Sequence, residues 1–87
     1  MVVQKITDIV RTSDVLFYID EFQANAVYNI LGNRKDGKIK FRVENTATGE
    51  KNISVQLIDK IDYPALQLQM ELKRAINKLI GEDQLPV

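Results

Sequence analysis

The chain has 87 residues, with 12 lysines and arginines balanced by 12 aspartates and glutamates, and it contains neither cysteine nor histidine. This length leaves room for one hydrophobic core, so residues 1–87 are expected to form a single compact domain. The lack of cysteine excludes disulfides, thiolate metal sites and a cysteine nucleophile. The lack of histidine removes the commonest general base and the commonest transition-metal ligand. A net charge of zero gives the whole molecule no attraction to nucleic acid or to an anionic membrane.

The first dozen residues have two interpretations. Apolar residues from Val2 to Val10 fit a helical stripe, although all of them are β-branched and favour a strand locally. We favour an N-terminal helix that covers the second face of a sheet. If residues 2–12 are extended instead, Ile6 to Arg11 would open a five-stranded, SH3-like barrel. Because Lys5 and Asp8 interrupt the apolar residues, no secretion signal is predicted, and a cytoplasmic location is expected.

Alternating patterns predict strands in the middle of the chain. Lys38 to Glu44 alternates without a fault, with Ile39, Phe41 and Val43 on one side. Asn52 to Leu57 alternates in the same way. The turn residues between them, 45–50, predict an antiparallel pair.

Two earlier segments, Val15 to Asp20 and Ala26 to Leu31, are expected to be further strands. Residues 33–37 are expected to form the turn that leads back from Lys38 to the second of them. Val15 to Asp20 is apolar on both faces, which is typical of a central or doubly covered strand.

A helix is predicted near the end of the chain, over residues 61–80. Leu68, Leu72, Ala75, Ile76 and Leu79 recur at helical spacing. Asp62 stands where an N-cap would, Pro64 suits a first turn, and Gly81 suits the left-handed residue after the last turn. The expected fold class is therefore α+β: an antiparallel meander of about four strands with the C-terminal helix packed on one face. The alternative is a small SH3-like β-barrel with a C-terminal helix.

No pattern of residues predicts an enzyme or a bound cofactor. Residues 32–38 fit the spacing of a phosphate-binding loop, but Ile39 follows where that loop needs a hydroxyl, and a strand follows where it needs a helix. The acid–base candidates are five carboxylates, which capping and solvation explain. They are Asp14, Asp20, Glu21, Asp59 and Asp62. We expect no catalytic residues, no metal ligands and no cofactor.

Positive charge is concentrated in one part of the chain. Residues 33–51 hold six of the cations and three anions. Lys38, Lys40 and Arg42 project from the same side of one strand at intervals of about 6.5–7 Å. Together with Arg34 and Lys35 they form a basic hairpin, residues 33–42, that could follow a phosphate backbone. Such a row is also common on a solvated edge strand, so nucleic-acid binding is the alternative function and is not favoured.

The front of the predicted helix is apolar on two opposite sides. Leu66 and Met70 lie about 160° and 200° around the helix axis from Leu68, with Tyr63 beside them. One flank packs on the sheet, and the second needs another cover, either the N-terminal segment or a second subunit. We therefore expect a small non-catalytic protein-interaction module, homo-oligomeric or bound to another protein through Tyr63, Leu66 and Met70. No membrane association is expected.

The layout of strands, basic hairpin and C-terminal helix is similar to that of the PC4-like single-stranded-DNA-binding coactivators. The overlap runs from Lys51 to Val55 and through the helix, which is roughly the last 40 residues. The resemblance implies binding of single-stranded DNA. The chain departs from that pattern because its predicted strands are short and Tyr63 is its only aromatic residue near the helix start.

Overall fold

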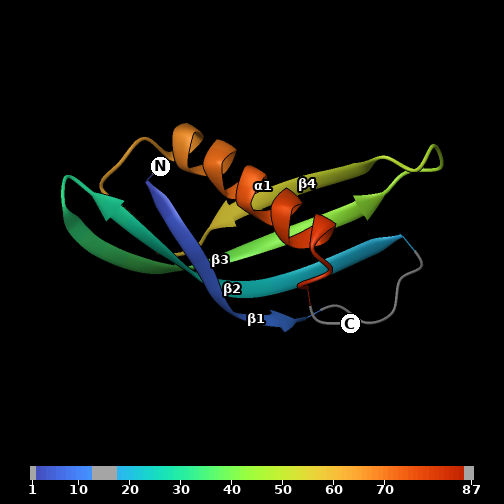
Figure 1. The fold of residues 1–87 in the computed structure, drawn as a ribbon, viewed down its shortest axis with the longest axis horizontal. Coiled ribbons are helices and arrows are strands. Elements are labelled where there is room, and N and C mark those ends of the chain that lie inside the picture. The colour runs from blue at the N-terminus through green and yellow to red at the C-terminus, as the bar shows by residue number, and fades with distance from the viewer. Residues whose placement is uncertain (1, 13–17, 86–87) are drawn as a thin grey trace.

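The computed structural model describes residues 2–12 and 18–85, which form a four-stranded sheet and one helix. Each strand pairs antiparallel with the one before it, in the order β1-β2-β3-β4, and the helix follows the last strand (Figure 1). This confirms the α+β meander with a C-terminal helix. The elements are β1 (Val3–Arg11), β2 (Ile19–Ile30), β3 (Asn33–Asn45), β4 (Lys51–Leu57) and α1 (Ala65–Gly81).

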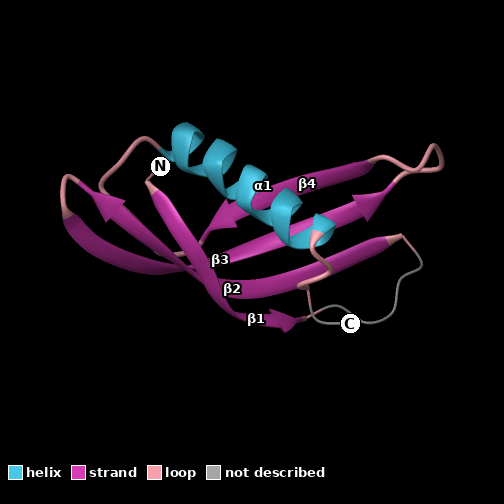
Figure 2. Ribbon diagram, viewed as in Figure 1, coloured by secondary structure: helices cyan, strands magenta, loops and turns pink. Residues whose placement is uncertain are grey.

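Helix α1 lies across one face of the sheet and packs against β4 and β1, the two edge strands (Figure 2). No other helix occurs within residues 2–12 and 18–85, so the opposite face of the sheet has no helical cover. We call this opposite side the open face. The sheet thus has one side that builds the core and one side whose residues are available for other contacts.

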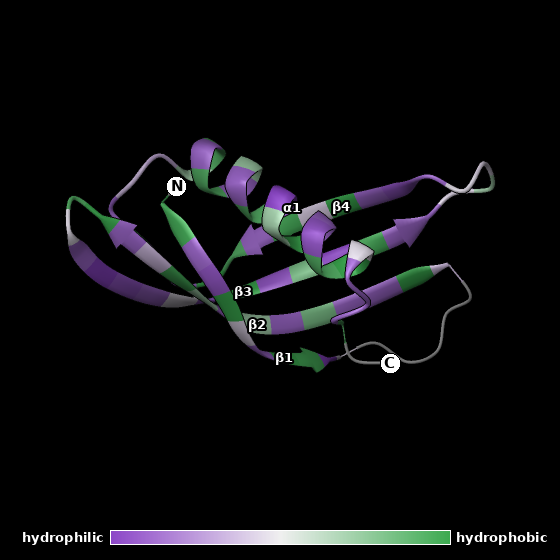
Figure 3. Ribbon diagram, in the orientation of Figure 1, coloured by the Kyte–Doolittle hydropathy of each residue, from purple (hydrophilic) through white to green (hydrophobic). Residues whose placement is uncertain are grey.

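The core forms because the strand alternation and the helix stripe face each other. Ile39, Phe41 and Val43 are buried on β3, and the rings of Phe22 and Phe41 stack with their centroids 5.0 Å apart. Figure 3 shows the alternating hydrophilic and hydrophobic bands along the strands. From α1, Leu68, Leu72 and Ile76 complete the core with no exposed surface. The predicted inner stripe of the helix is confirmed.

The expected N-terminal helix is wrong, because residues 3–11 form strand β1. Val3 lies opposite Tyr28 and Ile6 opposite Ala26, so these β-branched residues pair with β2 rather than covering the sheet. A register shift follows Thr7, where Asp8 has a positive φ of 53°, and it bends the strand. Glu71 of α1 accepts a hydrogen bond from the Val3 backbone N–H at 3.1 Å. This bond ties the start of β1 to the helix.

The turn of the central hairpin lies earlier than predicted. Leu31 and Gly32 form a two-residue turn with φ values of 51° and 81°, as a type I′ turn requires. The expected turn over residues 33–37 is wrong, because those residues begin β3. The two expected strands before it are parts of one, β2, whose first residue is Ile19. Residues 15–17 of the predicted Val15 to Asp20 strand lie outside the described residues.

Both ends of α1 differ from the prediction. Pro64 occupies the N-cap position without a side-chain hydrogen bond, so Asp62 is not the cap. Gly81 is the last helical residue, and the left-handed residue is Asp83, with a φ of 55°. Asp83 donates its N–H to the Ile80 carbonyl and Gln84 donates to Leu79, which is the bonding pattern of a Schellman motif.

Candidate functional site

The open face of the sheet carries a row of cations from β3. Its inner side holds Ile39, Phe41 and Val43, so the alternation turns Lys38, Lys40 and Arg42 outward. The register sets polar side chains beside them on both neighbouring strands. These are Asn25, Gln23 and Glu21 on β2, and Gln56 and Ser54 on β4. Three strands therefore build one polar surface around the row.

Two further cations belong to this face, and one predicted cation does not. Arg34 lies opposite Asn29 on the outward side of the hairpin. Lys5 on β1 lies opposite Val27, which shares the outward side of β2. Lys35 points to the other side, opposite Tyr28. We call the outward set the basic face, and it consists of Lys5, Arg34, Lys38, Lys40 and Arg42.

Acidic residues neutralise part of this charge. Arg42 forms an ion pair with Glu21, with Nη2 and Oε1 separated by 3.1 Å. Asp36 and Glu44 also lie on the outward side of β3. Within the described part of the chain, the side-chain ammonium groups of Lys38 and Lys40 form no ion pair with a carboxylate. Of the five cations of the basic face, Arg42 alone is neutralised by an ion pair among the described residues.

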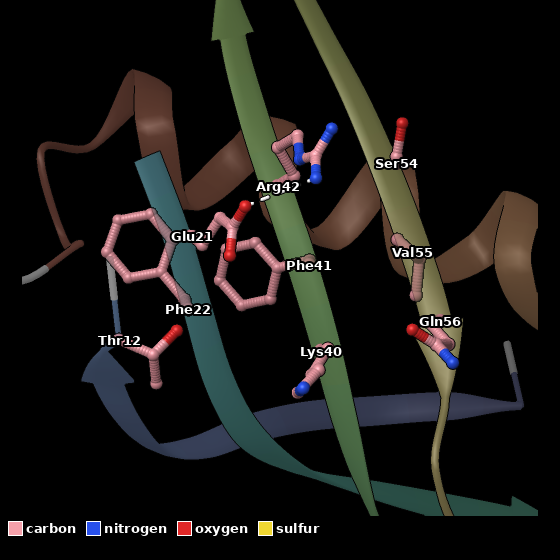
Figure 4. A pocket seen from close by; sticks show the side chains of 9 residues that line it. All are labelled: Thr12, Glu21, Phe22, Lys40, Phe41, Arg42, Ser54, Val55 and Gln56. Carbon is pink, nitrogen blue, oxygen red and sulfur yellow. Dashed lines mark hydrogen bonds and ion pairs between the residues drawn. The ribbon is translucent and has the colours of Figure 1, made fainter. Parts of the chain in front are cut away.

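A hollow of about 280 Å³ opens at this point, between β2, β3 and β4 (Figure 4). It offers two cations, two hydroxyls and an amide, together with the carboxylate that pairs with Arg42. Figure 4 shows the Glu21–Arg42 ion pair at its rim. Its polar lining consists of Thr12, Glu21, Lys40, Arg42, Ser54 and Gln56. Such donors suit an anionic oxygen better than they suit a metal ion.

Three of the five carboxylates considered as acid–base candidates, Asp20, Glu21 and Asp59, make contacts between elements of the fold. Asp20 pairs with Arg11 between β1 and β2. Asp59 accepts a hydrogen bond from the Lys38 backbone N–H at 2.8 Å, which ties the loop before α1 to β3. Asp14 lies outside the described residues. Among residues 2–12 and 18–85, no three acidic side chains cluster as metal ligands would.

One buried side chain near Asp59 has a perturbed pKa. The Tyr28 side chain is 1% exposed, and no described residue accepts a hydrogen bond from its hydroxyl. Burial raises the pKa of Tyr28 above its ordinary value of 10.0, and the Asp59 carboxylate raises the pKa further. The hydroxyl is closed off from solvent, so it serves no site on the surface.

The outer ridge of α1 is the second surface that the sequence singled out. Leu66 and Met70, one turn apart, are 72% and 52% exposed. Tyr63 does not join them, because it is half-buried and packs against the core. The N-terminal segment, one of the two covers considered for this flank, lies in the sheet as β1. No described segment of the chain covers Leu66 and Met70.

Sequence reasoning missed several polar members of the open face. Lys5 was missed because residues 2–12 were assigned to a helix, and Gln23 and Asn25 were missed because the chain between Asp20 and Ala26 was not recognised as strand. A signal was present, since Phe22, Ala24 and Ala26 alternate with the polar residues Glu21, Gln23 and Asn25 at the start of β2. A strict count of that alternation would have extended the strand.

Comparison with known proteins gives one match. The model of the BB-0187 family matches residues 1–81. No curated protein and no solved structure matches the chain. Separately, no helix in the described ranges is both long enough and apolar enough to cross a bilayer.

Proposed function

The chain belongs to the BB-0187 family, and we propose that it is a non-catalytic interaction module that pairs with a second copy through the outer ridge of α1. The observation that carries the proposal is the exposure of Leu66 and Met70, which lie side by side on the helix. Two adjacent exposed apolar side chains on one side of a helix give a partner apolar surface to bury. We propose the cytoplasm as its location, and a fold without cysteine does not depend on an oxidising compartment.

The size of the apolar ridge sets the strength of this association. Fully burying a leucine or methionine side chain contributes about 1.5–3 kcal/mol, and part of each side chain is already covered. Burial of two such residues per copy must offset the loss of translational and rotational entropy on association, which costs several kcal/mol. We therefore expect a dimer that forms and dissociates with concentration.

The test is the oligomeric state in solution. Sedimentation and light scattering over a range of concentrations should give a dimer that the double substitution Leu66→Lys plus Met70→Lys converts to a monomer. The matched control is Val10→Lys plus Leu31→Lys, which adds the same charge at two exposed apolar positions outside α1. A wild-type chain that stays monomeric at the highest concentration would refute the proposal, and so would a control that dissociates equally.

A second candidate function is binding of single-stranded nucleic acid on the basic face. Lys38 and Lys40 support it, because they lie in one row on a side of the sheet that no described helix covers. Residues two apart on a strand are about 6.5–7 Å apart, which is comparable with the spacing of successive phosphates on one strand of nucleic acid. The hollow beside Lys40 and Arg42 would accept a phosphate oxygen.

The residues around the basic face indicate whether the bases of a bound nucleic acid would stack on the protein. The residues that the described sheet pairs with Lys38, Lys40 and Arg42 are Asn25, Gln23, Glu21, Gln56 and Ser54, so in residues 2–12 and 18–85 no paired neighbour of this row offers a ring for a base to stack on. Affinity would then come from phosphate contacts alone, independent of sequence. For three or four contacts on a single strand, affinity should fall about 20–50-fold between 50 and 200 mM salt.

Fluorescence anisotropy with a labelled oligonucleotide tests this candidate. At about 50 mM salt, where phosphate contacts are least screened, the wild-type chain should bind and Lys38→Glu plus Lys40→Glu should not. The matched control is Lys73→Glu plus Lys78→Glu, which changes the net charge equally on exposed positions of α1. Absence of wild-type binding at low salt, or an equal loss in both variants, would eliminate nucleic-acid binding through the basic face.

A further inference from the structure

The turn between β2 and β3 exposes a leucine in an unfavourable backbone conformation. Leu31 has a φ of 51°, and its side chain is 96% exposed. Type I′ turns favour asparagine or aspartate at this position, because the left-handed conformation brings Cβ close to a carbonyl oxygen. Leucine disfavours the turn and gains nothing from burial within the fold. Such a residue indicates a contact that the turn makes outside the molecule.

Leu31 also lies at one extreme of the molecule. Figure 1 shows the turn at the left end of the long axis, past the start of α1. We call Leu31 and Gly32 the hairpin tip. The tip is convex and protrudes, so it is shaped to enter another surface and not to receive one.

Cations flank the hairpin tip on both sides. A hollow of about 430 Å³ on one side is lined in part by Lys5 and Arg34, and a hollow of about 420 Å³ on the other is lined in part by Lys35 and Lys60. Asp62 is the single carboxylate among the described residues that line them. All four cations are exposed, and none forms an ion pair with a described residue. This end of the protein is therefore positive, although the whole chain has a net charge of zero.

We propose that the hairpin tip binds an anionic lipid bilayer, with Leu31 among the acyl chains and the four cations at the level of the phosphate groups. Arg34 and Lys35 follow Gly32 by two and three residues, so their backbone lies about 7–10 Å behind the tip. Apolar groups of interfacial segments lie about 5–10 Å into the boundary between headgroups and acyl chains. The cations thus meet the phosphates when Leu31 is inserted. The local charge supplies the attraction that the net charge does not.

The order of apolar and charged groups favours a bilayer over other anionic partners. A bilayer has an apolar layer beneath a layer of negative charge, and the hairpin tip has an apolar side chain ahead of its cations. Nucleic acid would contact the cations but leave Leu31 in water. One leucine and a few cations give weak, reversible binding of the kind that a single lipid chain provides.

Leu31→Asn separates binding from folding, because asparagine suits the type I′ turn. The assay is sedimentation with vesicles of phosphatidylcholine and phosphatidylglycerol at about 50 mM salt, where attraction to lipid phosphates is least screened. Leu31→Asn should lower the vesicle partition coefficient about tenfold or more, and it should also raise the melting temperature. Wild-type protein that does not sediment with these vesicles would overturn the proposal, and so would unchanged binding by Leu31→Asn.

The contribution of charge is measured with a matched pair of variants. Arg34→Gln plus Lys35→Gln should weaken binding about tenfold, whereas Lys73→Gln plus Lys78→Gln, which removes the same charge from exposed positions of α1, should change it less than about twofold. Vesicles of phosphatidylcholine alone should bind the wild-type chain about tenfold more weakly or less. Equal losses in the two variants, or equal binding to both kinds of vesicle, would contradict the proposed role of the cations.

A single tryptophan reports insertion directly, because the natural chain has none. On addition of anionic vesicles, the fluorescence of Leu31→Trp should shift to shorter wavelength and be quenched by lipids brominated on their acyl chains. Val10→Trp is the control, since Val10 is 59% exposed but lies on β1 away from the tip. Stronger quenching of Leu31→Trp than of Val10→Trp supports insertion of the tip, and equal quenching of the two overturns it.

Discussion

Gly37 is the position where the loop before α1 crosses the sheet, and a side chain there should destabilise the protein. A Cβ added to Gly37 would lie 3.1 Å from the Asp59 Cβ and 3.3 Å from the Ile61 Cδ1. Ordinary carbon contacts are about 3.5–4.0 Å, so the loop must move by a few tenths of an ångström. It cannot move freely, because the backbone N–H groups of Ile58 and Asp59 donate to the Lys38 carbonyl at 3.0 and 3.3 Å.

The size of the effect follows from this geometry. Gly37→Val inserts three carbons against the anchored loop, and such overpacking costs about 1–3 kcal/mol, offset in part by the higher strand propensity of valine. We expect Gly37→Val to lower the free energy of unfolding by about 1–2 kcal/mol net, and Gly37→Ala to lower it by less. In a domain of this size, 1 kcal/mol lowers the melting temperature by about 4–8 °C.

Thermal and urea denaturation measure this loss, with Gly81→Ala as the control. Gly81 is helical and has nothing within 4 Å of an added Cβ, so alanine should stabilise the helix by a few tenths of a kcal/mol to about 1 kcal/mol. A Gly37→Val protein that unfolds at the wild-type midpoint would show that the loop does not pass over Gly37, and the reasoning would fail.

Three further changes test other contacts. Glu71→Ala should lower the free energy of unfolding by about 1–3 kcal/mol in urea denaturation, because the buried Val3 N–H loses its acceptor. Glu71→Gln should lower it less, because glutamine keeps an acceptor oxygen. Equal losses in the two variants would contradict this role. Tyr28→Phe should leave stability at pH 7 unchanged or higher, because the buried hydroxyl has no partner among described residues. The raised pKa of Tyr28 means that the unfolded chain releases the proton first, so wild-type stability should fall as pH rises above about 10, and Tyr28→Phe should lessen that fall. Leu72→Ala should lower the free energy of unfolding, measured by calorimetry, by about 2–5 kcal/mol, because the side chain is fully buried. A loss below about 1 kcal/mol would exclude a close-packed core around Leu72.

Local patterns predicted the parts of the fold that local forces determine. The alternation of Ile39, Phe41 and Val43 and the helical spacing of Leu68, Leu72 and Ile76 both survive in the structure, because each set buries one face against the other. The turn at residues 45–50 was also predicted, and Gly49 takes a positive φ of 87° there. Periodicity is a reliable guide where one face of an element is buried.

Other features depend on contacts between distant residues and could not be read locally. Val3 and Ile6 fit a helical stripe as well as a strand, and pairing with β2 decides between them. Gly37 resembles a turn glycine, although its missing side chain makes room for Asp59 and Ile61. Leu31 gives no sequence signal for a type I′ turn, yet it adopts a positive φ and is 96% exposed.

The candidate surfaces were predicted in part for the same reasons. The exposure of Leu66 and Met70 follows from the helical wheel, while Tyr63 turns toward the core because it precedes the helix. Lys38, Lys40 and Arg42 share a face because strand alternation is strict, but Lys35 falls on the opposite side by the same rule. The contribution of Lys5 required knowing that β1 pairs with β2.

The chain-order pairing of the strands has a consequence for how the protein folds. Each strand finds its partner in the segment just before it, so few distant loops must close, and collapse of the hairpins should be rapid. The helix that seals the hydrophobic interior follows all four strands in the chain, so it leaves the ribosome after them. Until Leu68, Leu72 and Ile76 have emerged, the nascent sheet exposes its apolar side to other chains. The interval between the emergence of β4 and that of residues 65–76 is therefore when the nascent chain is most vulnerable to aggregation.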